Sequence, residues 1–386
     1  MPIENGAVRW FYSRSRRAGV AAKLKDPFRA LRYLGKAVRG IREHGREAQE
    51  LWGVSPFRQI LAYMPLYFRF GHSIDEFYFY RLCSPEWRRY AALFLPWRRM
   101  TALECLYETI GVDVNVLQDK GQFARRCVAR ELPVIPTILE LDQGNLQWSN
   151  PSEPSLPPIE IVVKPRDGRH ARGVRAYAKV PGGYRGEDSE VVEAPTLIEA
   201  WATESHCGSL IVQPRVRNAK ELSAWSEGAL CSVRLVTTRR SPDPPVPLAA
   251  RFRMPRADKV ADNLNRGGIA SIIDLASGEL GPAQAFDVSE VMRGIVYDRH
   301  PQTGQPIAGR RLPRWEDVIA LGVKAHEQFE GFHSIGWDIA ITSDGPLLIE
   351  GNHDWGVRFV QYQGPTPLGR TRFPEDLRDR FKQRRR

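Results

Sequence analysis

The 386-residue sequence lacks a long apolar run, a recognisable export signal and any paired cysteine motif. No apolar run reaches the roughly 18–20 residues that cross a bilayer, and the N-terminus has no short apolar core of the kind that secretion signals carry. The cysteines are odd in number and scattered, so they indicate neither a disulfide framework nor a zinc site. They are Cys83, Cys105, Cys127, Cys207 and Cys231. We therefore expect a soluble, cytoplasmic protein.

Repeats of fixed period and low-complexity tracts are also absent, apart from a basic KQRRR tail. With 42% hydrophobic and 26% charged residues the composition is globular, and the length suggests about two to three domains. Lys and Arg number 56 against 45 Asp and Glu, a net charge of +11. This balance favours anionic partners, such as phosphate groups, acidic substrates, nucleic acid or an anionic membrane, without choosing among them.

The first 110 residues are predicted to be helical and unlike the rest. From Val20 to Arg42, apolar residues recur at steps of three and four with basic residues between them. This spacing predicts a basic amphipathic helix. The aromatic-rich block from Phe57 to Trp97 is predicted to be divided into short helices by its prolines, Pro65, Pro85 and Pro96.

After residue 110, strand patterns alternate with helix patterns. Apolar, β-branched runs predict strands at Ile159–Pro165, Leu210–Gln213, Cys231–Thr237 and Ile335–Thr342. Helical spacing predicts helices at Gly121–Arg130 and Trp315–Gln328. Between them, Leu132–Thr137 is expected to be extended, and residues 142–158, rich in turn formers, to be a loop. The fold class indicated is an α/β or α+β body behind a helical region.

The most informative segment, residues 336–352, predicts a β-hairpin with polar groups at the far ends of its strands. Glu350 and Asn352 are two apart and share a face. A two-residue turn at 344–345 would place Asp338 on the opposite face, whereas a three-residue turn at 344–346 would bring all three side chains together; we expect the longer turn. Such oxygen donors suit Mg²⁺ bound with phosphate and water. The alternative is that these polar ends merely meet solvent.

A second signal is Lys164, which closes an apolar strand and is followed by a loop containing Gly168 and Gly173. A glycine loop can fold over phosphates while the lysine supplies a point charge. The spacing is not that of a Walker A motif. A lysine at a strand end that simply reaches solvent explains Lys164 equally well.

Weaker signals lie on the later strands. The strand that ends at Gln213, with the backbone on to Val216, could present polar groups to a purine edge, although an edge strand ended by proline is the commoner explanation. Arg234, within an apolar strand, needs an anionic partner or must face solvent. The loop residues Asn263, Gly267 and Gly268 suit close backbone approach to phosphate, or form only a tight loop.

The order of these segments resembles the ATP-grasp superfamily, and within it the family called sugar-transfer associated ATP-grasp. The likeness runs from about Asn115 to Gly364, and the hairpin ending in Ile349-Glu-Gly-Asn352 is its most specific part. The resemblance implies an α+β fold in which two lobes hold ATP. A helical region, 1–110, would precede an N-terminal lobe with a lid, 111–209, and a C-terminal lobe with the metal site, 210–386.

The resemblance also implies a role for each candidate residue. Lys120 and Lys164 would contact the nucleotide phosphates, and Arg234 the γ-phosphate during transfer. The remaining nucleotide-binding positions implied are Gly168 and Gly173 in the lid, Gln213 and Val216 at the adenine, and Asn263, Gly267 and Gly268. Asp338, Glu350 and Asn352 would hold Mg²⁺ or Mn²⁺. The sequence departs from the superfamily at Gln213, where an acidic residue is usual, and Glu221 is the candidate for the ribose.

The activity implied is ATP-dependent ligation of a carboxylate to an amine through an acyl phosphate, in decorating a polysaccharide or cell-surface polymer. The partners would be ATP and small or sugar-linked substrates. Two alternatives stay open: a kinase that phosphorylates a sugar-type hydroxyl, and a basic scaffold that binds membrane or nucleic acid through residues 14–42 and the C-terminal arginines. We expect no nucleic-acid partner, and a weak contact with an anionic membrane stays open.

Overall fold

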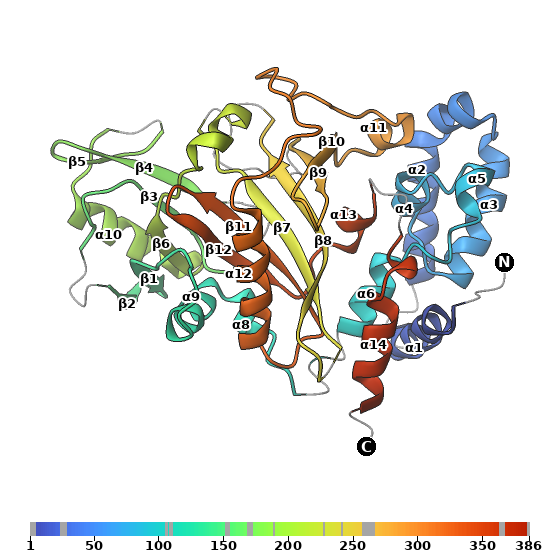
Figure 1. The fold of residues 1–386 in the computed structure, drawn as a ribbon, viewed down its shortest axis with the longest axis horizontal. Coiled ribbons are helices and arrows are strands. Elements are labelled where there is room, and N and C mark those ends of the chain that lie inside the picture. The colour runs from blue at the N-terminus through green and yellow to red at the C-terminus, as the bar shows by residue number, and fades with distance from the viewer. Residues whose placement is uncertain are drawn as a thin grey trace.

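The computed structural model describes residues 5–23, 29–104, 107, 111–150, 155–167, 173–187, 190–226, 228–240, 242–256, 267–362 and 367–383. Three positions singled out in the sequence, Cys105, Gly168 and Asn263, lie outside these ranges. Within them the chain forms two antiparallel six-stranded sheets and a group of helices (Figure 1). The fold is the α+β arrangement of two lobes behind a helical region that the sequence led us to expect.

The first sheet has the strand order β2-β1-β6-β3-β4-β5. Its strands are β1 (Leu139–Asp142), β2 (Asn145–Ser149), β3 (Ile161–Pro165), β4 (Arg175–Val180), β5 (Gly183–Arg185) and β6 (Leu210–Pro214). Helix α10 (Ala194–Glu204) packs on one face, where Trp201 and Val163 belong to a small apolar core. Because side chains alternate along a strand, Lys164 and Gln213 stand on the other face.

The second sheet has the order β10-β9-β8-β7-β11-β12. Its strands are β7 (Ser232–Thr238), β8 (Val246–Met254), β9 (Ile269–Ile273), β10 (Leu280–Ala285), β11 (Ser334–Thr342) and β12 (Gly345–Asn352). Three helices contribute to the core on one face: α8 (Asn115–Gln118), α9 (Lys120–Ala129) and α12 (Trp315–Gln328). Leu235 and Trp337 lie in that core, and their strand neighbours therefore point to the opposite face.

The opposite face of the second sheet carries the helical region (Figure 1). This region consists of α1 (Gly6–Lys23), α2 (Arg29–Trp52), α3 (Pro56–Arg69), α4 (Ile74–Phe79), α5 (Pro85–Arg88) and α6 (Trp97–Glu104). Helices from later in the chain join it: α11 (Val288–Arg293), α13 (Val357–Gln361) and α14 (Phe373–Gln383). The buried Gln361 side chain bonds both the N–H of Leu95, at 2.9 Å, and its carbonyl, at 3.0 Å. The helical region thus shares one core with the second lobe. Short 3₁₀ turns complete the fold at Ser205–Cys207, Lys220–Trp225 and Leu368–Arg370.

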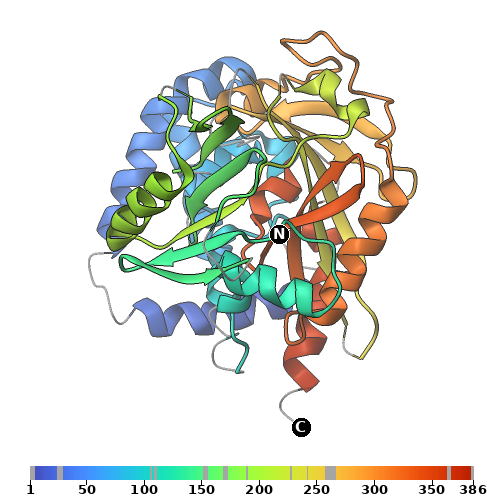
Figure 2. The same cartoon turned by 90° about the vertical axis from the view of Figure 1, so that its left-hand side faces the viewer.

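Two chain segments connect the sheets. In the segment 132–138, Ile135 N–H donates to Leu348 O of β12 at 3.1 Å, and Ile138 N–H donates to Val212 O of β6 at 2.8 Å. In the segment 214–219, Ala219 N–H donates to Ile341 O of β11 at 2.8 Å. Figure 2 looks along the long axis from the side of the first sheet, with the helical region behind. The two lobes are therefore connected by a hinge that consists of the two short backbone segments 132–138 and 214–219.

The predicted helices and strands after residue 110 are present, with ends that shift by one or two residues. The loop expected over 142–158 is wrong in part, because residues 145–149 form β2. Gln143 and Gly144 both have positive φ, 48° and 80°, which is the conformation of a two-residue hairpin turn. Strand β6 belongs to the first sheet, so the chain leaves that lobe after Pro214 and not at the expected boundary of 209/210.

Two expectations for the helical region also differ from the structure. The helix expected from Val20 to Arg42 falls on two helices, α1 ending at Lys23 and α2 beginning at Arg29, with residues 24–28 outside the described ranges. Pro65 does not end a helix and lies inside α3. Tyr63 and Leu66, on either side of it, are buried, and this packing outweighs the hydrogen bond that proline removes.

Gly336 of β11 gives the first testable prediction. A Cβ at this position would lie 2.2 Å from Cβ of the fully buried Trp355, so Gly336→Ala would displace that side chain. We expect a loss of about 1–3 kcal/mol in the free energy of unfolding, measured with urea. Gly35→Ala in α2 is the matched control, because no atom of the described residues lies within 4 Å of its added Cβ. A Gly336→Ala protein as stable as the wild type would contradict the packing described.

Candidate functional site

A row of alternating charges crosses three adjacent strands of the second sheet. Glu350 on β12 stands opposite Asp338 on β11, and Asp338 stands opposite Arg234 on β7. Residues directly opposite each other share a face, so all three side chains point to the side of the sheet that does not carry α12. Asp338 is therefore the anionic partner that Arg234, within an apolar strand, requires.

The hairpin reaches this register in a way that the sequence analysis did not foresee. The expected three-residue turn at 344–346 is wrong, because Thr342 pairs with Gly345 and leaves the two-residue turn 343–344. The pairing then shifts between Asp338 and Ile339, where Ile349 is the extra residue of a β-bulge. The bulge, and not the turn, returns Asp338 to the face of Glu350.

Asp338 is the buried centre of this row. Its carboxylate pairs with Nε of Arg234 and receives a second bond from Arg234 Nη2 at 3.0 Å. Arg253 on β8 reaches the same carboxylate at 2.9 Å. Burial alone would raise the pKa of Asp338, but the two arginines hold it at about 2. Both carboxylate oxygens are thus engaged by guanidinium groups.

Glu350 and Asn352 are half-buried and lie beside each other at the end of β12. Asn352 Nδ2 donates to Glu350 Oε1 at 3.3 Å. Among the described residues, no group of three or more His, Cys, Asp or Glu side chains is placed to hold a metal ion. The set here is instead the Glu350 carboxylate, the Asn352 amide and the arginine-bound Asp338. Carboxylate and amide oxygens fit a hard divalent cation that takes its other ligands from phosphate and water.

Two lysines, one on β3 of the first sheet and one at the start of α9, lie near the Glu350 end of this row. Lys164, at the end of β3, lies close enough to Glu350 on β12 for their charges to interact, and Lys120 at the start of α9 lies close to Lys164. Lys164 keeps some contact with solvent, but burial and then the positive charge of Lys120 lower its pKa to about 8, with Glu350 acting in the opposite direction. Two cations are therefore held together where a polyanion would relieve their repulsion.

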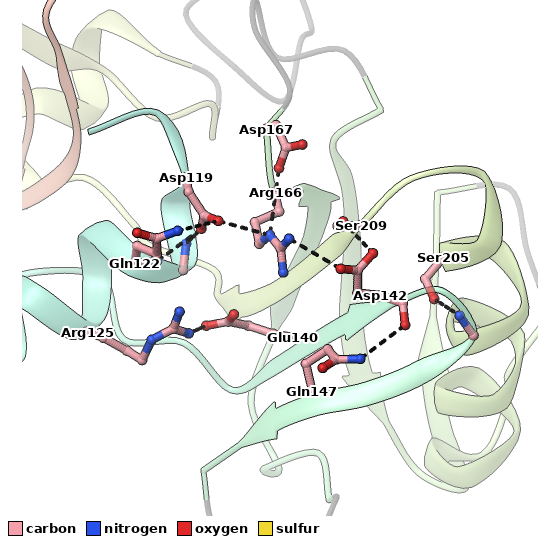
Figure 3. Close-up of polar contacts among 12 residues, drawn as sticks. Asp119, Gln122, Arg125, Glu140, Asp142, Gln147, Arg166, Asp167, Ser205 and Ser209 are labelled. Atoms are coloured by element: carbon pink, nitrogen blue, oxygen red, sulfur yellow. Dashed lines mark hydrogen bonds and ion pairs between the residues drawn. The ribbon is translucent and has the colours of Figure 1, made fainter. Parts of the chain in front are cut away.

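Arg166 ties together the segments that carry the two lysines, and Figure 3 shows its contacts with the aspartates around it. Its guanidinium lies 3.3 Å from Asp119, which caps α9, and 3.4 Å from Asp142 at the end of β1. Its carbonyl accepts bonds from the backbone N–H of Lys120 at 3.4 Å and from its ammonium at 3.3 Å. The start of α9 is thereby tied to the end of β3, two residues after Lys164. Sequence reasoning missed Arg166, because its partners come from separate segments of the chain.

Gln213 lies at the hinge. Its side chain is 4% exposed, and Nε2 donates to Ile135 O at 3.2 Å. Its Oε1 is buried and makes no hydrogen bond within the described residues. A buried acceptor without a donor costs free energy, so this atom is suited to a ligand that brings an N–H group. Val216 follows three residues later in the hinge and is half-buried.

The glycines predicted to contact nucleotide do not all lie beside Lys164 and Glu350. Gly173, with φ +72°, lies against Pro165, next to Lys164. Gly267 is exposed and Gly268 buried at the start of β9, which β8 separates from β7. Gly168 and Asn263 lie outside the described residues. Arg253 was missed in the sequence and joins the site, because only the pairing of β7 with β8 brings it beside Asp338.

A cysteine and a histidine of the second lobe remain to be placed. Cys231 is buried in the core of the second lobe, and the cysteines within the described residues, Cys83, Cys127, Cys207 and Cys231, form no disulfide. His353 follows Asn352, and its Nε2 lies 2.6 Å from Gln118 Nε2 in α8. Helix α8 thus contacts the end of β12 beside the site. Within the described residues, no helix combines the length and the apolar character needed to cross a bilayer.

The family described as sugar-transfer associated ATP-grasp matches residues 108–371. No curated protein gives a significant match to the chain. Among solved structures, D-cycloserine synthetase is 16% identical, with 73% of this chain and 77% of that chain covered and a TM-score of 0.40. A D-alanine–D-alanine ligase from Bacillus anthracis, complexed with ATP, is 12% identical, with 73% of each chain covered and a TM-score of 0.38. These structural likenesses are loose, and the family match carries the assignment.

The two carboxylates of the site should differ in what they do for stability. Asp338→Asn would leave Arg234 and Arg253 without their shared counter-ion, and we expect unfolding to become easier by about 3–5 kcal/mol. Glu350→Gln, half-buried at the strand end, should change stability by less than about 1 kcal/mol. Chemical denaturation of both variants tests this, with Asp344→Asn in the exposed turn as the control. Equal effects at 338 and 350 would refute the arginine-centred arrangement.

Proposed function

The chain belongs to the sugar-transfer associated ATP-grasp family, and on this premise we propose that it is an ATP- and Mg²⁺-dependent ligase that joins a carboxylate to an amine. The single observation that carries the proposal is the approach of Lys164, on the first sheet, to Glu350, on the second. A cation of one lobe thus faces an oxygen donor of the other. This is the arrangement required to hold a metal-bound triphosphate between two lobes.

The residues of the site have distinct roles in this proposal. Lys120 and Lys164 hold the phosphates, and Arg234 stabilises the charge on the phosphoryl group as it is transferred. Gln213 Oε1, which lacks a hydrogen bond within the described residues, accepts one from the adenine amino group. Val216 lines the adenine, and Gly173 lets the backbone beside Lys164 approach the phosphates.

Glu350 and Asn352 would hold Mg²⁺, with Asp338 completing the set. When bound, the metal would neutralise phosphate oxygens and orient them for transfer. Triphosphate oxygens would also give Arg234 and Arg253 new anionic partners, so that Asp338 no longer has to satisfy both guanidiniums. The same two arginines therefore compensate the buried carboxylate before nucleotide binds and the phosphates afterwards.

The proposed reaction has two steps. A substrate carboxylate oxygen attacks the γ-phosphorus, and the bond from that phosphorus to the β-phosphate oxygen breaks. ADP is the leaving group, and the product is an acyl phosphate. The amine nitrogen then attacks the acyl carbon, phosphate leaves, and the nitrogen loses a proton to give the amide. Because water would hydrolyse the intermediate, the lobes have to close about the hinge segments 132–138 and 214–219 during turnover.

The family's association with sugar transfer supports a substrate that is linked to a sugar, and we propose a role in modifying a polysaccharide or cell-surface polymer. A kinase would use the same nucleotide site but would leave a phosphorylated hydroxyl and no amide. The product therefore decides between the two chemistries.

The intermediate can be trapped. The purified protein, incubated with ATP, Mg²⁺ and a panel of uronic and amino acids, should release ADP in the presence of its carboxylate substrate, and added hydroxylamine should capture a hydroxamate. We expect Glu350→Gln to lower ADP release at least about 100-fold, because a metal ligand is lost. Glu316→Gln, on the exposed surface of α12, should retain full activity. A phosphate ester in place of a hydroxamate would overturn the ligase and favour the kinase.

Nucleotide affinity should also depend on pH through Lys164. Its pKa of about 8 means that the ammonium is charged at pH 7 and loses its proton as the pH rises above 8. ATP should therefore bind more weakly from pH 8 upward, by up to about tenfold per pH unit, in titration calorimetry. Lys164→Met should bind weakly throughout and lose most of this dependence. Lys324→Met, exposed on α12, should follow the wild type. An identical pH profile in wild type and Lys164→Met would contradict the role of Lys164.

A further inference from the structure

Helix α3 carries large apolar side chains on both its buried and its exposed side. Its buried side carries Gln59, Tyr63 and Leu66, which pack into the helical region. On the opposite side Phe57 is 68% exposed, Leu61 58% and Phe68 68%. Spacings of four and seven residues place these three side chains in one stripe along the helix. Large apolar side chains gathered on an exposed face are a mark of a surface that meets a partner or a membrane.

Basic and aromatic residues border this stripe. Helix α3 contains no acidic residue, and the exposed Arg58 and Arg69 lie near its two ends. At the start of α6, Trp97 is 44% exposed, and the guanidinium of Arg98 lies 5.7 Å from the ring of Tyr67 on α3. Apolar anchors bordered by arginine and tryptophan are the composition of helices that lie in the interface of a bilayer.

The charge of the chain is concentrated in the same region. Residues 1–110 contain 19 lysines and arginines against 10 acidic residues, a net charge of +9, whereas residues 111–386 contain 37 against 35, a net charge of +2. Nearly all of the surplus of +11 therefore belongs to the helical region. An anionic lipid surface complements this charge, and each basic residue near such a surface contributes about 1 kcal/mol.

We propose that α3 docks the protein onto an anionic lipid bilayer, with Phe57, Leu61 and Phe68 entering the interface and Arg58 and Arg69 meeting lipid phosphates. A second copy of the chain is a poorer occupant, because it would bring one region of charge +9 against another. Figure 1 places α3 at one end of the long axis and β4 and β5 at the other. Docking through α3 therefore leaves the first lobe and the hinge free to move.

This surface differs from the one suggested by the sequence. The basic amphipathic pattern lies in residues 14–42, but the side chains of residues 16–34 are outside those that the structure describes. The inference rests instead on the exposed side chains of α3. It does not depend on the proposed ligase chemistry.

Vesicle co-sedimentation of the full chain tests the proposal. The wild type should bind vesicles of phosphatidylcholine with about 30% phosphatidylglycerol, and bind pure phosphatidylcholine vesicles at least about tenfold more weakly. The double variant Phe57→Ser with Phe68→Ser should lower the partition constant at least about tenfold. Arg58→Gln with Arg69→Gln should lower it and reduce its sensitivity to salt.

The matched control is Val128→Ser on α9, because this side chain is 61% exposed and lies in another part of the molecule. It should bind vesicles as the wild type does. All the substitutions are at exposed positions, and circular dichroism with thermal unfolding verifies that each variant folds. Light scattering should show a monomer for both wild type and the phenylalanine variant. Binding to anionic vesicles that is unaffected by the phenylalanine variant, or a dimer that dissociates in it, would overturn the proposal.

Discussion

The electrostatic contact between the lobes is the constraint on which the site depends. Lys164 of the first lobe lies close to Glu350 of the second and to Lys120 at the start of α9, and burial and repulsion by Lys120 lower the pKa of Lys164 to about 8. Charges of one sign that are held together in this way are costly without an anion. The two lysines stay close together despite this repulsion because Arg166 fixes the segments that carry them. Asp119, Asp142 and Asp167 surround the Arg166 guanidinium (Figure 3).

The second sheet also contains buried charges, and they are paired around Asp338. This carboxylate lies between Arg234 and Arg253 and is the counter-ion that the two partly buried guanidiniums share. The arrangement continues beyond the sheet, because Arg234 Nη1 also donates to the carbonyl of Trp355 at 3.0 Å. Trp355 is fully buried in the core shared with the helical region, and its Cβ lies against Gly336. Trp355 therefore links the charged row, through its carbonyl, to the core of the helical region, through its side chain.

The helical region is thus part of the second lobe and not an independent attachment. Gln361 and Leu95, far apart in the sequence, exchange hydrogen bonds inside this core. The region nevertheless differs from the lobes in charge and in the apolar stripe that it exposes on α3. One face of the helical region packs on the second sheet, and the other exposes α3 for docking onto a bilayer. The proposed docking surface therefore lies apart from the proposed catalytic site.

The sequence by itself determined the local elements and the periodic relations within them. The β-branched runs predicted β3, β7 and β11, and the two-residue spacing of Glu350 and Asn352 placed them on one face. Only the tertiary structure decided the register of Asp338, because the bulge at Ile349 depends on how β12 fits against β11 and the core beneath it. Arg253, Arg166 and the hinge bonds of Ile135 were also beyond the sequence. Each depends on pairing between distant segments, which local propensity does not encode.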